Sequence, residues 1–158
     1  MTLQPKPARL SRTEHTQIVL KEHINGQNRL FGGRLMEWID VVAAVAARRH
    51  AGYNVTTASI DTLNFKAPAF INDTIVLVGK VTYAGRTSME VRVDTFREAL
   101  DGTRELINRA YMDMVAIDCK GKPMEVPLLA LETEEQQAEW EAAQKRRQMR
   151  KQRRKEGY

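Results

Sequence analysis

The sequence predicts an α+β fold in which one strongly curved antiparallel sheet wraps around one long buried helix. The helix is indicated by Leu35 to Ala47, where apolar residues occupy nearly every position, a pattern typical of a helix that is buried all round. The strands are indicated by runs of β-branched or alternating apolar residues between residues 55 and 119. Short turns separate several of these runs, and short connections favour antiparallel neighbours because parallel strands need long crossovers.

The segment before the helix contains an arm, a strand and a turn. Residues 1–13 are mostly polar and include Pro5 and Pro7, so we expect a flexible N-terminal arm. Residues 14–24 hold several large aliphatic side chains and predict a first strand. Asn25 to Asn28 then supplies a turn, because glycine and asparagine tolerate a positive φ.

The helix and the strands after it follow from periodicity. The helix is predicted from Leu35 to His50, with Gly52 as its C-terminal stop and two arginines in its last turn. Four strands are predicted at residues 55–65, 74–83, 89–94 and 105–119. Apolar and charged residues alternate from Met89 to Asp94, which predicts a half-exposed strand.

Charge is distributed unevenly along the chain. The net charge is +5, from 25 basic and 20 acidic residues, but residues 144–158 alone hold eight basic residues and one acid. The rest of the chain holds 17 basic and 19 acidic residues, so the basicity belongs to the C-terminal segment. We therefore predict one domain over residues 14–130, followed by a charged helical extension over residues 131–158.

Composition excludes several classes of protein. A single cysteine, Cys119, excludes an intrachain disulfide framework and fits a reducing compartment. The longest apolar stretch is too short to span a bilayer, and the first residues contain no apolar run of a secretory signal, so we expect a cytoplasmic location. His15, His23 and His50 lie far apart without the spacing of metal ligands. We interpret them as surface or turn histidines and expect no metal site.

Asp40 is the most unusual residue of the predicted helix. It lies between apolar neighbours, and an ionised carboxylate that is buried without a partner costs on the order of several kcal/mol or shifts its pKa. A functional carboxylate and one satisfied by a neighbouring strand or subunit are both open at this point. Glu37 lies near the helix start, where a carboxylate favours the helix dipole, so we interpret it as structural.

Phe31, Gly32 and Gly33 lead directly into the predicted helix. Glycines at a helix start let backbone N–H groups approach a ligand, and the dipole favours negative charge there. An oxyanion on an attacked carbonyl is such a charge, and one donor of this kind is worth on the order of 10²–10³ in rate. A tight turn or a packing contact explains a glycine pair alone, but its combination with a helical carboxylate indicates a site.

A longer set of residues forms one pattern: Asn25, Asn28, Phe31–Glu37, Asp40, Thr57–Phe65 and Gly85–Glu90. This pattern resembles the signature of the cytosolic (brain-type) acyl-CoA hydrolases, which belong to the hotdog-fold thioesterase superfamily. The resemblance covers about residues 14–140. Its main departure is Asn28 at a position often held by glycine, and asparagine is well suited to the left-handed conformation needed there.

The resemblance implies hydrolysis of fatty acyl-CoA to free fatty acid and CoA, a step of lipid metabolism. Asp40 would act as general base or orient the attacking water, and Asn25 would position the water or the thioester. The backbone N–H groups of Gly32 and Gly33 would polarise the thioester carbonyl. In hotdog dimers the helix of one subunit faces the active-site loop of the other, so Asn25 and Asp40 of one site would come from different chains.

The resemblance also implies the partners of the chain. Acyl-CoA is the expected substrate, and its candidate binding residues are Phe31, Arg86, Thr87 and Ser88. Arg86 would meet the CoA phosphates, although a solvated turn arginine explains it equally well. The expected assembly is a homodimer within a hexamer that is a trimer of dimers. No cofactor is implied apart from coenzyme A as part of the substrate and product.

Two alternatives remain open. One is a non-catalytic hotdog module that binds or senses acyl-CoA, although such a protein would lack the catalytic asparagine and aspartate. The other is binding of nucleic acid or an anionic membrane by the basic C-terminal segment. That segment lacks the interleaved aromatic residues of a base-stacking surface. We therefore expect neither nucleic-acid nor membrane binding, but a helix that is solvated or contacts CoA or an adjacent subunit.

Overall fold

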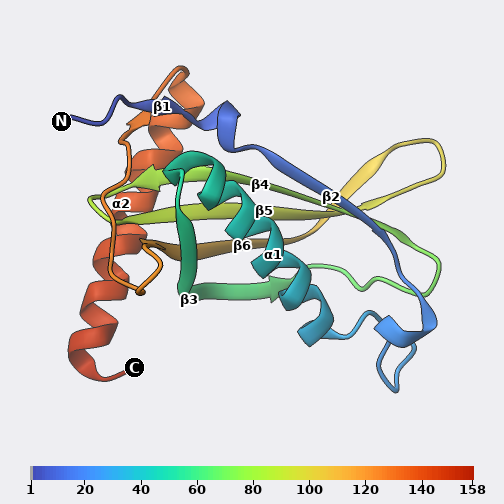
Figure 1. Ribbon diagram of the computed structural model, residues 1–158. Helices are drawn as coiled ribbons and strands as arrows, with labels where there is room; N and C mark the ends of the chain where they lie inside the picture. The colour runs from blue at the N-terminus through green and yellow to red at the C-terminus, as the bar shows by residue number, and fades with distance from the viewer. Residues whose placement is uncertain (1) are drawn as a thin grey trace.

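The computed structural model describes residues 2–158 (Figure 1). Its elements are β1 (Lys6–Pro7), the 3-10 helix η1 (Ala8–Ser11), β2 (Thr13–Ile18), the 3-10 helix η2 (Lys21–His23), α1 (Gly32–Ala51), β3 (Asn54–Phe65), β4 (Thr74–Ala84), β5 (Ser88–Glu98), β6 (Arg104–Ile117), β7 (Leu129–Ala130) and α2 (Glu134–Glu156). The predicted order of one strand, one long helix and four further strands is confirmed.

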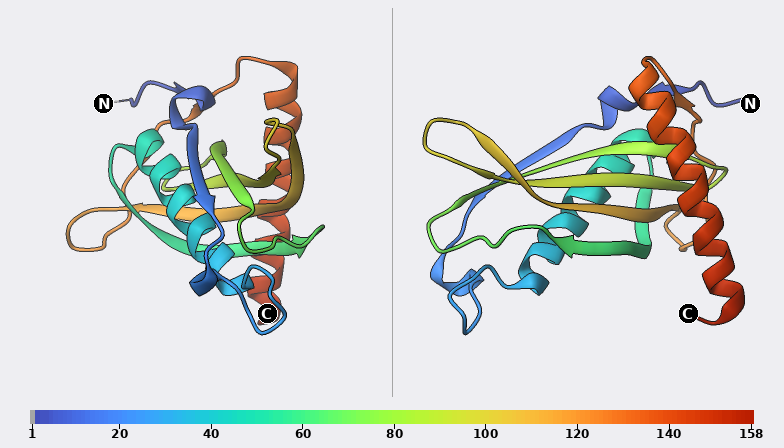
Figure 2. Two further views of the ribbon diagram at one scale, coloured as in Figure 1. Left: turned by 90° about the vertical axis from the view of Figure 1, so that its right-hand side faces the viewer. Right: turned by 180° about the vertical axis from the view of Figure 1, so that it is seen from behind.

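Strands β2 to β6 form one five-stranded antiparallel sheet in the order β2-β4-β5-β6-β3. Figure 2 shows this sheet curved around α1, with α2 lying across the opposite face. A curved antiparallel sheet wrapped around one central helix is the hotdog fold, as the resemblance implied. Strand β3 is an edge of the sheet, and within the described residues it pairs only with β6.

Helix α1 lies in the curve of the sheet because one of its sides is apolar and close-packed. The buried residues of this side include Leu35, Trp38, Ile39, Val42, Ala43, Ala46 and Ala47. Gly79 of β4 allows the helix to approach closely, since a Cβ at this position would lie 2.7 Å from Cγ1 of Val42. The helix ends at Gly52, which has a φ of 75° and donates its N–H to the carbonyl of Arg48.

The expectation that this helix is buried all round is wrong for a single chain. Met36 is 39% exposed and Val41 is 58% exposed, because the sheet covers only one side of α1. Composition identified the apolar residues correctly, but it does not reveal which of them the same chain covers. The uncovered side therefore presents Met36 and Val41, together with the carboxylates of Glu37 and Asp40, at the surface of the protomer.

The outer face of the sheet is polar and yet buried. On β5, Met89, Val91 and Val93 belong to the core beneath α1, whereas Glu90 and Asp94 project from the opposite face. Glu90 is 1% exposed and Asp94 is 7% exposed. The prediction of a half-exposed strand is therefore wrong, because arginines of α2 cover Glu90, while Arg92 and Arg109 of the sheet pair with Asp94.

The N-terminal residues pack against the sheet, where we expected a flexible arm. Strand β1 pairs with β7 in a small parallel sheet. Ser11 is fully buried, and its Oγ accepts a hydrogen bond from the Val81 N–H at 2.9 Å and donates one to the Ala8 carbonyl at 2.6 Å. Such backbone contacts depend on tertiary structure, so a polar sequence gives no sign of them.

Helix α2 is capped at both ends. The Thr133 side chain accepts a hydrogen bond from the Gln136 N–H at its start, and Gly157 ends it with a φ of 90°. Its buried residues are Ala143 and Arg150, so charged contacts form much of its attachment to the sheet. Among residues 2–158, no helix is both long and apolar enough to cross a membrane.

Candidate active site

The loop before α1 is shaped by Asn25. Its side-chain Oδ1 accepts hydrogen bonds from the N–H groups of Gln27, at 2.8 Å, and Arg29, at 3.3 Å. Asn28 closes the turn by donating its N–H to the Asn25 carbonyl, and its φ of 58° is the left-handed conformation that we expected. The loop occupies Oδ1 and leaves the Asn25 Nδ2 group without an acceptor among the described residues, so this amide can donate to a ligand.

The start of α1 presents two further donors. The N–H groups of Gly32 and Gly33 have no acceptor within residues 2–158, because the N-cap residue, Phe31, has no side-chain oxygen to cap the helix. Unpaired N–H groups at a helix start carry partial positive charge. The Phe31 ring is 55% exposed and covers Gly33, where an added Cβ would lie 2.7 Å from the ring.

Asn25 and Gly32 line the same pocket, which has a volume of about 350 Å³. This volume lies within the range of small-molecule sites. The wall of the pocket includes the apolar residues Leu30, Leu35, Phe65 and Ile107. Two cations, Arg29 and Lys66, also line it, and none of its lining residues is a carboxylate. The pocket therefore combines hydrogen-bond donors with apolar walls but lacks a general base.

The carboxylate that could serve as base lies on the side of α1 that faces β3. Asp40 Oδ1 accepts a hydrogen bond from Thr57 Oγ1 at 2.5 Å, and the residue is only partly buried. Its Oδ2 has no partner among the described residues and can accept a proton from water. Glu37 is exposed and pairs with Arg34 at 3.0 Å, which agrees with a structural role.

These two groups of residues do not meet within one chain. Asp40 follows Gly32 on α1 by eight residues, which separates them by about 12 Å along the helix axis at about 1.5 Å per residue. One water molecule cannot bridge that distance, and Asp40 does not line the pocket of Asn25 and Gly32. A single chain therefore holds donors without a base in one place and a base without these donors in another.

The Arg86-Thr87-Ser88 turn lies at the opposite end of the sheet from the start of α1 (Figure 1). Strand β4, whose 11 residues span about 33 Å at about 3.3 Å per residue, runs between the two ends of the sheet. The Arg86 guanidinium is exposed and pairs with Glu125 at 3.1 Å. Within one chain the structure therefore does not bring these three candidate binding residues to the pocket.

Three polar residues that we did not single out from the sequence lie at these places. Thr57 contacts Asp40, and Arg29 and Lys66 line the pocket. Thr57 belongs to a run that carried the resemblance, but its partner depends on how β3 packs against α1. Arg29 and Lys66 carry no spacing signal, since Arg29 follows the turn of residues 25–28 and Lys66 follows the end of β3, and only the fold brings these two places together.

The histidines were expected at the surface or in turns, but His23 and His50 are buried. Burial lowers the pKa of His50, so its neutral ring donates the Nε2–H to the Pro127 carbonyl at 2.7 Å. His23 Nδ1 accepts the Leu20 N–H at 2.9 Å, and its ring meets Trp38 edge-on. Within the described residues, no cluster of His, Cys, Asp and Glu has a metal-binding arrangement.

A larger cavity, of about 640 Å³, lies on the other face of the sheet beside α2. Its lining includes Asp61, Arg109, Tyr111, Arg146 and Arg153. It contains neither the donors at the start of α1 nor the carboxylate beside β3. The smaller pocket is therefore the better candidate for chemistry, despite its size.

Two sequence comparisons extend these observations. The sequence pattern of the thioesterase superfamily matches residues 27–101. The chain is 40% identical over 127 residues to a Bacillus subtilis protein described as an uncharacterized acyl-CoA thioester hydrolase, and the match covers 80% of this chain and 74% of that protein. It is 32% identical over 146 residues to acyl-coenzyme A thioesterase 11 of Mus musculus, covering 91% of this chain but only 25% of that longer protein.

Solved structures match the whole fold. A structure described as an apo-hexameric acyl-CoA thioesterase has a TM-score of 0.91 and 41% identity, covering 96% of this chain and 97% of the other. An acyl-CoA hydrolase from Staphylococcus aureus, in complex with butyryl-CoA, CoA and CoA disulfide, has a TM-score of 0.90 and 35% identity, covering 96% and 93%.

Variants of the Staphylococcus aureus enzyme bear directly on the candidate residues. Their structures have an asparagine, an aspartate and a threonine replaced by alanine, at positions that are 15 and then 17 residues apart. Asn25, Asp40 and Thr57 have the same spacing in this chain. The two groups of residues that geometry identified thus match positions that were chosen for substitution in a relative.

Proposed function

Because the chain belongs to the thioesterase superfamily, we propose that it hydrolyses acyl-CoA thioesters at a site shared between two copies of the chain. This proposal rests on one observation: within one chain, the hydrogen-bond donors and the candidate base lie in two separate places. Asn25 and Gly32 supply donors in a pocket without a base, and Asp40 with Thr57 supplies a base about 12 Å away along the helix. The products are a free fatty acid and CoA.

The exposed edge strand supports the pairing of two copies. Most of β3 is exposed, including Ile60 and Phe65, and its free edge offers backbone groups to another strand. Antiparallel pairing of β3 with a second β3 reverses the strand across a twofold axis. The Phe65 end of one copy, which lies beside Gly32, then comes alongside the Thr57 end of the other. This arrangement brings the donors of one chain toward the carboxylate of the next.

The proposed reaction is the attack of one water molecule on the thioester carbonyl. As the water oxygen bonds to the carbonyl carbon, Asp40 Oδ2 takes its proton, while Thr57 holds Oδ1. The Asn25 Nδ2 group and the Gly32 N–H, with Gly33 beside it, donate to the carbonyl oxygen as negative charge develops there. When the C–S bond breaks, the proton on Asp40 passes to the leaving thiolate, which yields the free acid and the thiol of CoA.

The phosphates of CoA need cations or N–H donors. Arg29 and Lys66 line the pocket of the proposed site, so we assign them this role within the chain. The turn of Arg86, Thr87 and Ser88 remains a candidate only from a second copy, because β4 places it at the far end of the sheet. Phe31 remains a candidate for packing against the substrate at the mouth of the site.

We also propose assembly into a trimer of dimers, supported by the 41% identical structure that is described as hexameric. The pairing through β3 would provide the dimers. A cytoplasmic location, and the need for no cofactor apart from the CoA of the substrate, remain predictions from the sequence. Size-exclusion chromatography with light scattering tests the assembly directly.

The release of free thiol from a panel of acyl-CoAs, short to long, tests the proposed function. Asp40→Asn and Asn25→Ala are each expected to lower kcat on the order of 10²–10³-fold with the fold intact by circular dichroism. Glu37→Gln, on the same helix, is the matched control and keeps its activity. If the wild type binds acyl-CoA but turns none over, the chain is a non-catalytic acyl-CoA-binding module.

A further inference from the structure

Three neighbouring strands each bring a buried carboxylate to the outer face of the sheet. Asp61 of β3, Asp113 of β6 and Glu90 of β5 are 8%, 9% and 1% exposed. Glu90 and Asp113 are direct cross-strand partners, and Asp61 pairs with Tyr111, two positions from Asp113. Carboxylates this close and this buried repel one another unless cations neutralise them.

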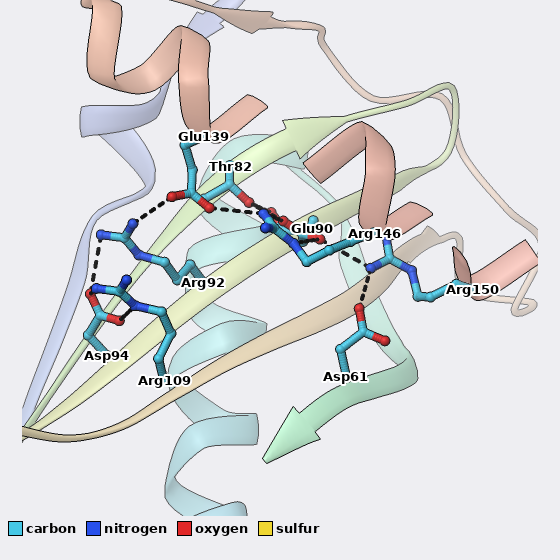
Figure 3. Close-up of polar contacts among 9 residues, drawn as sticks. All are labelled: Asp61, Thr82, Glu90, Arg92, Asp94, Arg109, Glu139, Arg146 and Arg150. Carbon is cyan, nitrogen blue, oxygen red and sulfur yellow. Dashed lines mark hydrogen bonds and ion pairs between the residues drawn. The ribbon is translucent and has the colours of Figure 1, made fainter. Parts of the chain in front are cut away.

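Arginines of α2 supply these cations (Figure 3). Arg150, whose side chain is 6% exposed, donates from Nη1 to Asp61 Oδ2 at 2.6 Å and to Glu90 Oε2 at 3.1 Å. It thereby links β3 to β5 across β6. Arg153 donates to the other oxygen of Asp61 at 2.9 Å, and Arg146 donates to both oxygens of Glu90. Arg147 also lies over the Tyr83 ring and donates to its hydroxyl. Four of the eight basic residues of the C-terminal segment therefore contact the domain: Arg146, Arg147, Arg150 and Arg153.

Strand β3 depends on this support more than the inner strands do. Within the described chain its only strand partner is β6, and the register of that pairing is irregular on both sides of Asp61, between Thr57 and Ser59 and between Asp61 and Asn64. The same strand carries Thr57, whose hydroxyl holds the carboxylate of Asp40. A movement of β3 relative to α1 would therefore misplace the proposed base.

We propose that the Arg150–Asp61 ion pair is a positioning element for the active site, acting through β3 and Thr57 on the carboxylate of Asp40. This inference rests on the proposed function. It gives the C-terminal helix a role in turnover from the opposite face of the sheet. Because α2 does not line the pocket of Asn25 and Gly32, loss of the pair lowers kcat and leaves KM almost unchanged.

Steady-state kinetics of α2 variants, measured at temperatures where each variant remains folded, test this role. Arg150→Met is expected to lower kcat by about 10- to 100-fold, as small displacements of a reacting group do, with KM within about twofold. Arg150→Lys recovers part of the rate, since a lysine keeps the charge but lacks the planar fork that bridges two carboxylates. Lys151→Met, at the adjacent exposed position, is the matched control and keeps the wild-type kcat.

A double-mutant cycle separates positioning from general loss of stability. If Arg150 acts through Thr57, then Arg150→Met costs much less in a Thr57→Val background than in the wild type. Equal fold losses in both backgrounds, or a loss confined to KM, would overturn the proposal. If Arg150→Met does not fold, Arg153→Met removes the second contact of Asp61 at a half-exposed position. The double-mutant cycle of Arg153→Met with Thr57→Val then tests the proposal by the same criterion.

Amide hydrogen exchange keeps this inference separate from the proposed function. Absence of turnover by the wild type refutes the function alone. Faster exchange over residues 54–61 in Arg150→Met than in Lys151→Met shows that α2 holds β3, as we infer. Identical exchange in the two variants refutes the positioning role, whatever the wild type hydrolyses.

Discussion

Replacement of Thr57 by valine is expected to slow turnover with little change in KM. Valine keeps the shape of the side chain but removes the hydroxyl that donates to Asp40 Oδ1 at 2.5 Å. Hydrogen bonds to charged groups contribute about 1.5–3 kcal/mol, and each 1.4 kcal/mol corresponds to about a factor of ten in rate. We expect valine to cost this energy in the transition state and not in the substrate complex, because Asp40 must be held toward the attacking water only there, so kcat falls by about 10- to 100-fold.

The assay is thiol release from the acyl-CoA that the wild type turns over fastest. Thr57→Ser keeps a hydroxyl at the same position and is expected to recover most of the rate. Thr57 is exposed in the protomer, so circular dichroism should show an intact fold for both variants. A valine variant with the wild-type kcat would show that Asp40 does not depend on Thr57, and our assignment of the base would be wrong.

Two further predictions concern stability, and thermal unfolding between about pH 4 and pH 8 tests both. Burial raises the pKa of Asp113, so the folded state binds this proton more strongly than the unfolded chain does, and stability falls as the pH rises through that window. Since Asp113 also lies directly opposite Glu90, Asp113→Asn is expected to gain about 1 kcal/mol, or about 2–4 °C, near pH 8, and to lose this gain below about pH 4. Burial lowers the pKa of His50, so the folded state binds fewer protons and stability is lost as the pH falls below about 6.5. His50→Gln removes that part of the pH dependence, and a difference from the wild type that does not vary with pH would contradict either explanation.

The parts of the fold that depend on local patterns could be predicted from the sequence. The apolar run of α1 and the glycine that ends it identified the central helix, and runs of β-branched or alternating apolar residues identified the strands around it. The left-handed turn at Asn28 followed from the resemblance, which places a glycine there in many relatives, together with the ability of asparagine to adopt that conformation. Gly32 and Asp40 stood out because a glycine pair at a helix start combined with a carboxylate among apolar residues indicates a site, whereas Asn25 was identified only through the family resemblance.

The parts that depend on contacts between distant segments could not be predicted. The alternation of β5 indicated a solvated polar face, because nothing in that strand shows that the arginines of α2, more than fifty residues later, cover Glu90. The buried ring of His50 depends on the Pro127 carbonyl in the same way. Lys66 could be identified as a candidate site residue only from the fold, which places it in the wall of the pocket.

Mixing two inactive variants tests the central claim, that each site combines Asn25 of one chain with Asp40 of another. Asn25→Ala and Asp40→Asn, expressed together in equal amounts, form mixed dimers in which one site has both residues and the other has neither. Random pairing of the two chains then restores about 25% of the wild-type turnover per site. Turnover no higher than that of either variant alone would contradict the shared site.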